Sequence, residues 1–456
     1  MKKTILIFLG VLAIAAGLAA DEPQDVMSAK YREFWNADVQ REIDERIEKY
    51  RKADSTVALE NVKPGTEVKV EQIGHKFLFG AHIFNFNQLG SDALNEKYKN
   101  VFGTLFNAAT IAFYWKTLEP EPGKPRFNES DKDTAEFWNH CAEPKKQPHW
   151  RRPAPDPVLE FCESKGLVTN GHPLIWGNRG WHHPDWLPTD AAAVDKMESL
   201  FEKRITEIAE HYQDRIDRWD VVNESAEDFQ LDRASRYGLM PNDYTFKAFQ
   251  VADRVFPKSV LFNINDYAVN DHYADQINDL LQRGCRIDVV GVQMHLFDPK
   301  ETLGVAEGKP IQTPEEQFKR LSSADKGGRP LHLSEITITA PGDDERGRAI
   351  QAEVARNLYR CWFSWPSMMG ITWWNTVDDC GAPGEPTTSG LFTRNMEPKP
   401  SFHALNQLIN DEWKTRFTFT ADSEKIEKNF RGFKGTYRVT WTDTNGAQQS
   451  KEFIVE

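Results

Sequence analysis

The sequence predicts an α/β fold, a closed (β/α)8 TIM barrel with a small accessory β module. From residue 77 onward, short apolar runs that end in polar residues alternate with longer stretches whose apolar residues recur at helical spacing. Eight such runs occur, and strands that are buried on both faces and alternate with helices form a parallel sheet. Segments at the two ends of the chain instead alternate apolar and polar residues, which indicates half-buried strands outside the barrel.

Each apolar run is short enough to be one barrel strand. In chain order, the runs cover residues 77–83, 108–113, 167–175, 215–224, 260–266, 288–295, 331–338 and 370–375. The clearest amphipathic helices between them are predicted over 191–214 and 345–364. An open doubly wound sheet is the alternative, but no GxGxxG turn follows an early strand. Eight strand and helix units therefore favour the closed barrel.

The two flanking segments predict the accessory module. Residues 55–73 contain a Pro-Gly turn followed by valines that alternate with charged residues, which is typical of a hairpin with one solvated face. In the tail, Tyr437, Val439 and Trp441 share one face, and Asn445-Gly446 is the preferred sequence of a type I′ hairpin turn. A tail this short buries little core alone. We expect it to pack with the 55–73 hairpin, or onto the barrel.

The predicted organisation has four parts. They are a signal peptide (1–20), an N-terminal helix and β-hairpin (21–76), the barrel (77–410) and a C-terminal β module (411–456). The first part has two lysines, an apolar run from Ile5 to Leu18 and small residues before Asp21, as a secretory signal does. We therefore expect a secreted or periplasmic protein. No other stretch reaches the ~18 apolar residues of a membrane helix, so no membrane partner is expected.

Composition excludes several other functions. A net charge of −13 argues against a nucleic-acid partner, because phosphate binding requires clustered Lys and Arg. The five cysteines are few, odd in number and lack a CxxC pair, which excludes a disulfide scaffold or a zinc ribbon but leaves room for one or two disulfides. The 14 Trp suit a large core, and also suit stacking on sugar rings.

Polar residues close most of the apolar runs. The active site of such a barrel lies at the carboxyl ends of its strands, so these residues should converge. They are His82, Lys116, His172, Trp176, Asn223, Glu224, Asn265, Asp266, Gln293, His295, Glu335, Trp374 and Asn375.

Glu224 and Glu335 form the central pair of this set. Cleavage of a glycosidic bond requires two carboxyl groups, one that protonates the leaving oxygen and one that attacks the anomeric carbon or activates water. An ionised Glu335 nearby would keep Glu224 protonated, which suits a retaining reaction. Alternatively, Asn223-Glu224 are turn residues, because Ser225-x-x-Asp228 fits a helix capping box. Glu335 lies inside a buried strand, where an acid is costly unless it is used or paired.

Seven motifs resemble one enzyme family in its order along the chain. They are GHPLIW (171–176), WDVVNE (219–224), NDY (265–267), GVQMHL (291–296), LSEIT (333–337), GITWW (370–374) and EPKPSFHAL (397–405). Over residues 77–405 the sequence resembles glycoside hydrolase family 10, the endo-β-1,4-xylanase family. The resemblance implies a retaining β-glycanase, an endo-1,4-β-xylanase that acts on xylan or a related hemicellulose by double displacement, and the predicted signal peptide makes it a secreted one. We expect a monomer with no cofactor and no catalytic metal.

The resemblance also implies a role for each site residue. Glu224 would be the general acid/base and Glu335 the nucleophile. His295 would hydrogen-bond the nucleophile, and Asn223 and Gln293 would contact it and the 2-hydroxyl of the sugar. The subsites on the non-reducing side would be lined by Lys116, His172, Trp176 and Trp374.

Some positions depart from the family pattern. Ala112 and Phe113 stand where the family has Glu and Asn, Thr337 replaces the last Asp of the nucleophile motif, Gly177 replaces a His, and a Trp expected near Ala382 is absent. The loop over 138–156 clusters Lys145, Lys146, Arg151 and Arg152. It is either a solvated loop or a border of the non-reducing-side subsites that pairs with an acidic decoration.

The same residues are compatible with three other functions. The first is a non-catalytic carbohydrate-binding barrel, although such a protein would not need both Glu224 and Glu335. The second is a retaining β-glycanase with another polysaccharide specificity. The third is a metal-dependent hydrolase that uses His82, His172, His295 and Glu335, which the absence of an HxH or HExxH spacing disfavours.

Overall fold

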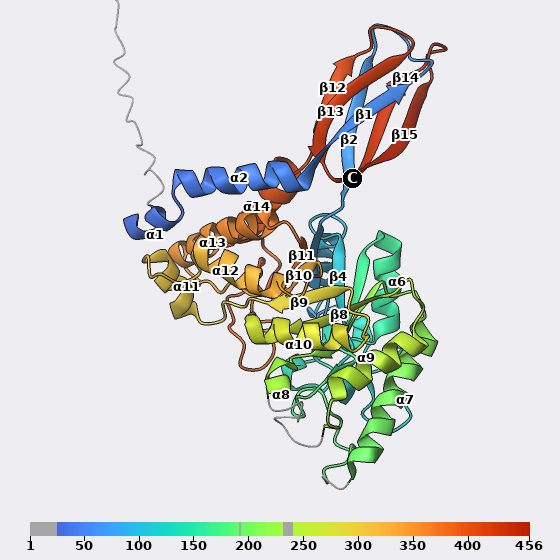
Figure 1. Cartoon of the computed structure of the whole chain (residues 1–456), viewed down its shortest axis with the longest axis vertical. Helices are drawn as coiled ribbons and strands as arrows, with labels where there is room; N and C mark the ends of the chain where they lie inside the picture. The colour runs from blue at the N-terminus through green and yellow to red at the C-terminus, as the bar shows by residue number, and fades with distance from the viewer. Residues whose placement is uncertain (1–24, 191–192, 231–239) are drawn as a thin grey trace, which may run out of the picture.

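The computed structural model describes residues 25–190, 193–230 and 240–456. A barrel and a separate β module are its two main parts (Figure 1). The signal peptide predicted for residues 1–20 lies outside the described residues. Within them, no helix has both the length and the apolar character to cross a membrane.

The barrel consists of eight parallel strands that close on themselves. They are β3 (Leu78–His82), β4 (Ala108–Ala112), β5 (Val168–His172), β7 (Arg218–Asn223), β8 (Leu261–Asp266), β9 (Val289–Gln293), β10 (Leu331–Ile336) and β11 (Met368–Trp373). Each strand pairs with the next, β5 pairs directly with β7, and β11 returns to β3 with Gly370 opposite Leu78. The short β6 (Ile175–Trp176) extends the edge of β7. The prediction of a closed barrel is confirmed, and the doubly wound alternative is wrong.

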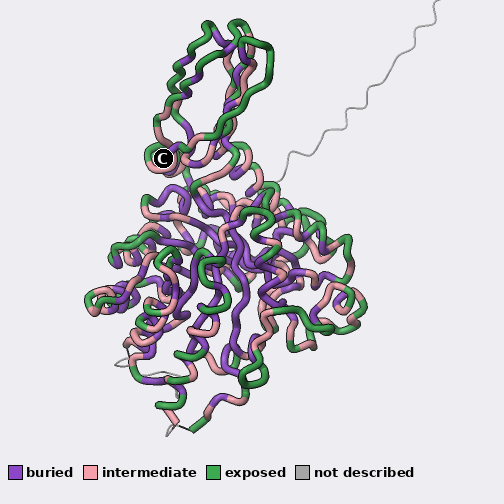
Figure 2. Tube along the Cα trace, turned by 90° about the vertical axis from the view of Figure 1, so that its right-hand side faces the viewer, coloured by how far each residue is buried: buried purple, intermediate pink, exposed green. Residues whose placement is uncertain are grey.

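Helices surround the strands, as expected for a sheet that is apolar on both faces. Those that follow or link barrel strands are α3 (Asp92–Val101), α4 (Trp115–Leu118), α5 (Ala135–His140), α6 (Pro155–Lys165), α7 (Val194–Tyr212), α8 (Ala226–Gln230), α9 (Tyr244–Val255), α10 (Asp271–Gln282), α11 (Pro299–Ala306), α12 (Pro314–Asp325), α13 (Glu345–Ser364) and α14 (Pro400–Gln407). The interior of the barrel is buried throughout (Figure 2).

Close contact between β5 and β7 requires a glycine. A Cβ at Gly171 would lie 2.3 Å from the ring of Trp219, which stands opposite it in the ladder. Trp219 is fully buried, so its ring has no free space into which it could move. The Gly in GHPLIW therefore has a packing role that brings β5, and the site residues at its end, against β7.

Both ends of the chain build the β module. Its strands are β1 (Lys52–Leu59), β2 (Glu67–His75), β12 (Arg416–Thr420), β13 (Ile426–Phe433), β14 (Gly435–Thr442) and β15 (Gln448–Val455). One sheet has the order β12-β2-β14-β15 and the other pairs β1 with β13, all antiparallel. Val68 and Val70 are fully buried beside Tyr437 and Val439 in a hydrophobic cluster separate from that of the barrel. The tail therefore pairs with the N-terminal segment.

The prediction of an N-terminal hairpin, however, is wrong. β1 and β2 lie in different sheets, and each finds its partners in the tail rather than in the other. The turn in the tail also differs from the prediction, because Thr442 pairs with Gln448 and leaves a five-residue loop. In that loop Asp443 accepts hydrogen bonds from the amides of Asn445 and Ala447, and Gly446 has a positive φ of 87° whereas Asn445 does not. A type I′ turn needs positive φ at both central residues.

The module is joined to the end of the barrel that is opposite the polar strand ends. β2 ends at His75 and β3 begins at Leu78, so the module adjoins the amino ends of the strands. Two N-terminal helices, α1 (Ala29–Phe34) and α2 (Ala37–Arg51), pack on the barrel and lead into β1 (Figure 1). All five cysteines are unpaired, so the disulfides for which the sequence left room are absent from the described residues, which include every cysteine of the chain.

Candidate active site

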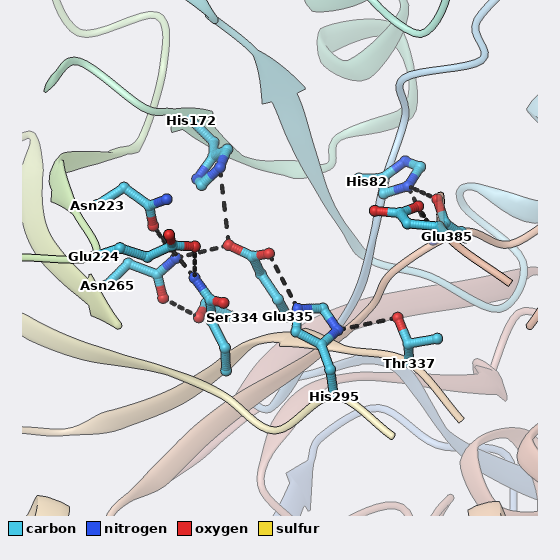
Figure 3. A network of polar contacts seen from close by, with 12 residues as sticks. His82, His172, Asn223, Glu224, Asn265, His295, Ser334, Glu335, Thr337 and Glu385 are labelled. Carbon is cyan, nitrogen blue, oxygen red and sulfur yellow. Dashed lines mark hydrogen bonds and ion pairs between the residues drawn. The ribbon is translucent and has the colours of Figure 1, made fainter. Parts of the chain in front are cut away.

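A cavity of about 680 Å³ lies at the carboxyl ends of the barrel strands. Eight predicted site residues line it, namely His172, Trp176, Asn223, Glu224, Gln293, His295, Glu335 and Trp374. They come from six different strands, namely β5, β6, β7, β9, β10 and β11, or from the turns that follow these strands. The expected convergence of strand ends is present, and it brings the two glutamates to one cavity (Figure 3).

Glu224 directly follows β7 and has an unusual backbone. Its φ is 55°, in the left-handed region that residues with a side chain rarely adopt, and its amide donates to the carbonyl of Asn265 over 2.7 Å. Its carboxyl group accepts hydrogen bonds from Nε1 of Trp176 at 3.0 Å and from Nε2 of Gln293 at 3.2 Å. The turn therefore directs the side chain into the cavity, where two donors hold it.

Glu335 lies within β10 and is buried. Its Oε1 accepts a hydrogen bond from Nδ2 of Asn265 at 2.8 Å and lies 3.8 Å from Nε2 of His172. Its Oε2 lies 3.3 Å from Nε2 of His295. Each carboxylate oxygen thus has polar neighbours, which offsets the cost of placing an acid inside a strand.

The surroundings of Glu224 favour its protonated form. Burial raises its pKa to about 7, and the charges of Glu335 and Asp266 act in the same direction. The hydrogen bond from Gln293 and the proximity of His172 oppose this increase. A carboxyl group with such a pKa can donate a proton at neutral pH and accept one later.

His172 forms a bridge between two acids. Its Nδ1 lies 2.8 Å from Oδ2 of Asp220, and both side chains are buried. Burial alone would lower the pKa of His172, but the hydrogen bond to Asp220 and the negative charge of Glu335 raise it above its ordinary value. The protonated form of His172 is therefore favoured next to Glu335.

Asn265 connects the site, although the family resemblance gave this strand-end residue no role. Its Nδ2 donates to Oδ1 of Asn223 at 2.8 Å as well as to Glu335, and its Oδ1 accepts from the hydroxyl of Ser334. The sequence placed Asn265 at a strand end. Nothing in the sequence, however, shows which neighbour a buried amide will contact.

Three aromatic side chains at the cavity were also missed. Trp181, Tyr267 and Phe297 line it with exposed fractions of 43%, 41% and 36%. Large exposed aromatic faces in a cavity suit stacking on a pyranose. Tyr267 follows Asn265 and Asp266 in the NDY motif, which was the one available signal for it.

Among the described residues, His, Cys, Asp and Glu side chains form no cluster of three or more that could hold a metal ion. The polar groups of the cavity instead pair with each other through hydrogen bonds.

Comparison with known proteins identifies the family. The model of glycosyl hydrolase family 10 matches residues 71–408, which is most of the chain. The chain belongs to glycosyl hydrolase family 10. It is therefore a member of a family of enzymes that act on O-glycosyl bonds.

Individual relatives are distant but cover long stretches. Endo-1,4-beta-xylanase B of Thermotoga neapolitana is 25% identical over 337 residues, which are 70% of this chain and 86% of that protein. The anti-sigma-I factor RsgI6 of Acetivibrio thermocellus is 26% identical over 409 residues, 88% of this chain and 46% of that protein. Xylanase 10B from Thermotoga petrophila RKU-1 in complex with xylobiose aligns at a TM-score of 0.57 and 21% identity over 74% of this chain and 95% of that chain, a likeness of fold.

For one predicted site residue of this family 10 member, Lys116, the structure shows a different position from the predicted one. Lys116 lies in α4, and its Nζ lies 3.4 Å from both the carbonyl oxygen of Gly180 and a carboxylate oxygen of Asp185. It is not among the residues that line the cavity. Tyr114, which precedes α4, occupies the cavity wall instead, with its ring centroid 5.5 Å from that of His172. The short helix turns Lys116 away from the strand end, so its predicted place in the subsites is corrected.

The contacts of the two amides differ from those that the family resemblance implied. The amide oxygen of Asn223 accepts from both Asn265 and Gln293, at 2.8 and 3.3 Å, which directs its NH2 group toward the cavity. Gln293 donates to Glu224 rather than to Glu335. Asn265 is the amide that contacts the predicted nucleophile.

His295 has the predicted contact with Glu335, and Thr337 supports it. Oγ1 of Thr337 lies 3.0 Å from Nδ1 of His295, and Thr337 is fully buried. A hydroxyl group thus orients the imidazole at the position where the family pattern has an Asp. The substitution keeps a hydrogen-bonding partner for His295 without adding a negative charge to the site.

The basic loop over 138–156 is divided between surface and cavity. Lys145 pairs with Asp379 and Lys146 with Glu143, both exposed, as a solvated loop predicts. Arg151 and Arg152 instead line the cavity, so the interpretation as a solvated loop is wrong for them. Arg151 is buried and donates to Oδ1 of Asn375 at 2.7 Å.

Proposed function

We propose that this family 10 member is an exported, retaining endo-1,4-β-xylanase that acts on xylan or a related hemicellulose by double displacement. The observation that carries the proposal is the pair of glutamates in one cavity, of which Glu224 has a pKa raised to about 7 while Glu335 is surrounded by hydrogen-bond donors.

In the first step, Glu335 attacks the anomeric carbon of the sugar. The carbon–oxygen bond to the leaving sugar breaks as the proton of Glu224 passes to the departing oxygen. His172 and Asn265 adjoin Oε1 of Glu335 and hold the carboxylate in place for the attack. The products of this step are a shortened saccharide and a glycosyl ester of Glu335.

In the second step, Glu224 acts as a base. The negative charge of Glu335 is lost in the ester, so one of the causes that raise the pKa of Glu224 disappears. Glu224 takes a proton from water, the water oxygen attacks the anomeric carbon, and Glu335 leaves as a carboxylate. The sugar is released with its original anomeric configuration.

The substrate class rests on the cavity and on the relatives. Trp176, Trp374 and the exposed rings of Trp181, Tyr267 and Phe297 offer apolar faces beside polar groups, which suits a chain of pyranose rings. Two of the proteins compared are named as xylanases, and one of them was crystallised with xylobiose. We extend that substrate to this chain as part of the proposal.

Export and a monomeric state complete the proposal. The support for export is the pattern of residues 1–20, with its two lysines, apolar run and small residues. Detection of a mature protein that begins near Asp21 outside the cytoplasm tests it. Light scattering of the purified protein tests the monomer.

A panel of xylans, decorated xylans and β-glucans tests the reaction, with the first-formed anomer followed by NMR. We expect the β-anomer to appear first and mutarotation to follow. Appearance of the α-anomer first, or full activity of Glu335→Ala, would falsify the mechanism. Lack of cleavage across the panel, together with measurable binding, would favour a carbohydrate-binding barrel.

A further inference from the structure

Arg152 extends from the loop between α5 and α6 into the cavity. Its guanidinium carbon lies 3.6 Å from the centroid of the Tyr114 ring and 5.3 Å from that of Phe84. Its Nη1 donates to the carbonyl oxygen of Arg151 at 2.8 Å. The aromatic faces and this bond hold the group in a fixed orientation at the cavity wall.

Arg152 has no direct ion-pair partner among the described residues, although the charge of Glu385 favours its charged form. Among the described residues, no carboxylate oxygen lies within 4.0 Å of its guanidinium. Its neighbour Arg151 differs, since Arg151 bonds to Asn375 and lies 3.7 Å from a carboxylate oxygen of Glu385. Burial lowers the pKa of Arg152 to about 10, so the group keeps its charge at neutral pH. A partly buried cation of this kind is stabilised by an anion that arrives with a ligand.

The position of Arg152 relates this charge to the catalytic pair. The ring of Tyr114, on which Arg152 stacks, lies 6.0 Å from that of Trp176. Trp176 in turn donates to Glu224. Tyr114 and Trp176 thus connect Arg152 with Glu224 along the wall of one cavity, which both glutamates also line.

We propose that Arg152 binds an anionic substituent of the substrate at the Tyr114 side of the cavity, where its guanidinium meets a carboxylate of a uronic acid or a sulfate ester. The planar fork of arginine matches either group through two parallel hydrogen bonds. The chain carries a net charge of −13, so binding of an anionic saccharide requires a local cation of this kind. This inference rests on the proposed function, in that it takes the cavity to be the saccharide site.

The experiment compares neutral xylo-oligosaccharides with three derivatives of the same length. One carries a uronic acid, one carries the same substituent with its carboxyl group reduced to an alcohol, and one carries a sulfate ester. The wild type, Arg152→Gln and Arg152→Lys are assayed for kcat/KM. Lys146→Gln is the matched control, because it removes one positive charge from the same loop at a residue that pairs with Glu143 outside the cavity.

We expect the ratio of kcat/KM for the anionic over the neutral substrate to fall at least tenfold in Arg152→Gln. Arg152→Lys should give an intermediate ratio and Lys146→Gln the wild-type ratio. A preference confined to the uronic acid, and lost on its reduction, assigns a carboxylate, whereas one confined to the sulfated substrate assigns a sulfate ester. If the wild type shows no preference for either anion, or Arg152→Gln lowers all rates equally, the proposal is overturned and Arg152 serves only to support Tyr114.

Binding measurements test this inference independently of the proposed function. Calorimetry with Glu335→Gln measures the affinity for the same oligosaccharides without turnover. Tighter binding of an anionic oligosaccharide that disappears in the double variant with Arg152→Gln supports the anion site even if no substrate is cleaved. Equal binding of anionic and neutral oligosaccharides refutes the anion site even if xylan is cleaved.

Discussion

The indole Nε1 of Trp176 donates a hydrogen bond to Oε2 of Glu224 over 3.0 Å. Trp176 therefore both forms part of the cavity wall and fixes the orientation of the predicted acid. On the other oxygen, Gln293 occupies the second acceptor position. Both donors favour the ionised form of Glu224. Burial and the charges of Glu335 and Asp266 nevertheless raise its pKa, against the hydrogen bond from Gln293 and the charge of His172.

The pH dependence of kcat/KM should show this balance. Glu224 must be protonated to act as the acid, so the rate should fall as the pH rises through about 7. In Glu335→Gln, which lacks one of the charges that raise it, the pKa of Glu224 should be lower than in the wild type but still above its ordinary value, because burial is the largest cause. Kinetics of the wild type and an NMR titration of the variant measure the two values. An unchanged pKa in Glu335→Gln contradicts the coupling.

Removal of the acid should affect substrates unequally. Glu224→Ala should lose about 10²–10⁴-fold in kcat on natural oligosaccharides, whose leaving oxygen needs a proton. With an aryl glycoside whose leaving group is a weak base, the loss in the first step should be much smaller. Glu335→Ala should be inactive on both. Equal losses for the two substrates in Glu224→Ala would argue against its role as acid.

The raised pKa should also make Glu224 destabilising. In the folded protein Glu224 holds its proton up to about pH 7, whereas in the unfolded chain it loses it near pH 4.3. The folded state therefore binds more protons between these values, and its stability falls as the pH rises through this window. Glu224→Gln should melt above the wild type at pH 8 by about 2–4 °C and match it more closely at pH 4. A melting temperature below that of the wild type at pH 8 would contradict the sign.

Thr337 should matter for catalysis through His295. Thr337→Val keeps the volume but removes the hydroxyl that lies 3.0 Å from Nδ1 of His295. Loss of a buried hydrogen bond of about 1 kcal/mol should reduce kcat by roughly fivefold. Thr337→Ser, which keeps the hydroxyl, is the control and should retain most of the activity. If the variants Thr337→Val and Thr337→Ser have the same kcat, the hydroxyl does not orient the imidazole of His295.

Two glycine variants test the packing between β5 and β7. A Cβ at Gly171 would lie 2.3 Å from the ring of buried Trp219, so Gly171→Ala should destabilise the fold by about 1–3 kcal/mol in chemical denaturation. Gly74 lies in β2 of the module, and a Cβ there would meet Thr436 at an ordinary 3.8 Å. Gly74→Ala should therefore leave the stability nearly unchanged. Comparable losses in both variants would contradict the argument.

The sequence predicted the barrel because its pattern does not depend on details of packing. Strands buried on both faces read as continuous apolar runs, and residues that end such runs meet at one rim whatever the neighbours are. Glu224 and Glu335 could be found for that reason. The partner of an alternating strand cannot be read in this way, so β1 and β2 were assigned to each other rather than to the tail.

The direction of side chains outside regular strands could not be predicted from the sequence either. Lys116 and Tyr114 are two positions apart, and only the start of α4 after Tyr114 decides which one faces the cavity. The cluster of charged residues over 138–156 suggested a solvent-exposed loop. Arg151 is nevertheless buried, because its guanidinium contacts Asn375 and His82. These contacts join residues more than sixty positions apart, which no local pattern records.

The pairing of both chain ends in one module has a consequence for biosynthesis. Among the described residues, β1 pairs with β13, and β2 pairs with β12 and β14, so neither strand can complete its sheet until nearly the whole polypeptide has been synthesised. Contacts this distant in sequence form slowly. The N-terminal strands can therefore pair only after the barrel segments that separate them from the tail have been synthesised, and the finished module joins the first and last segments of the folded chain.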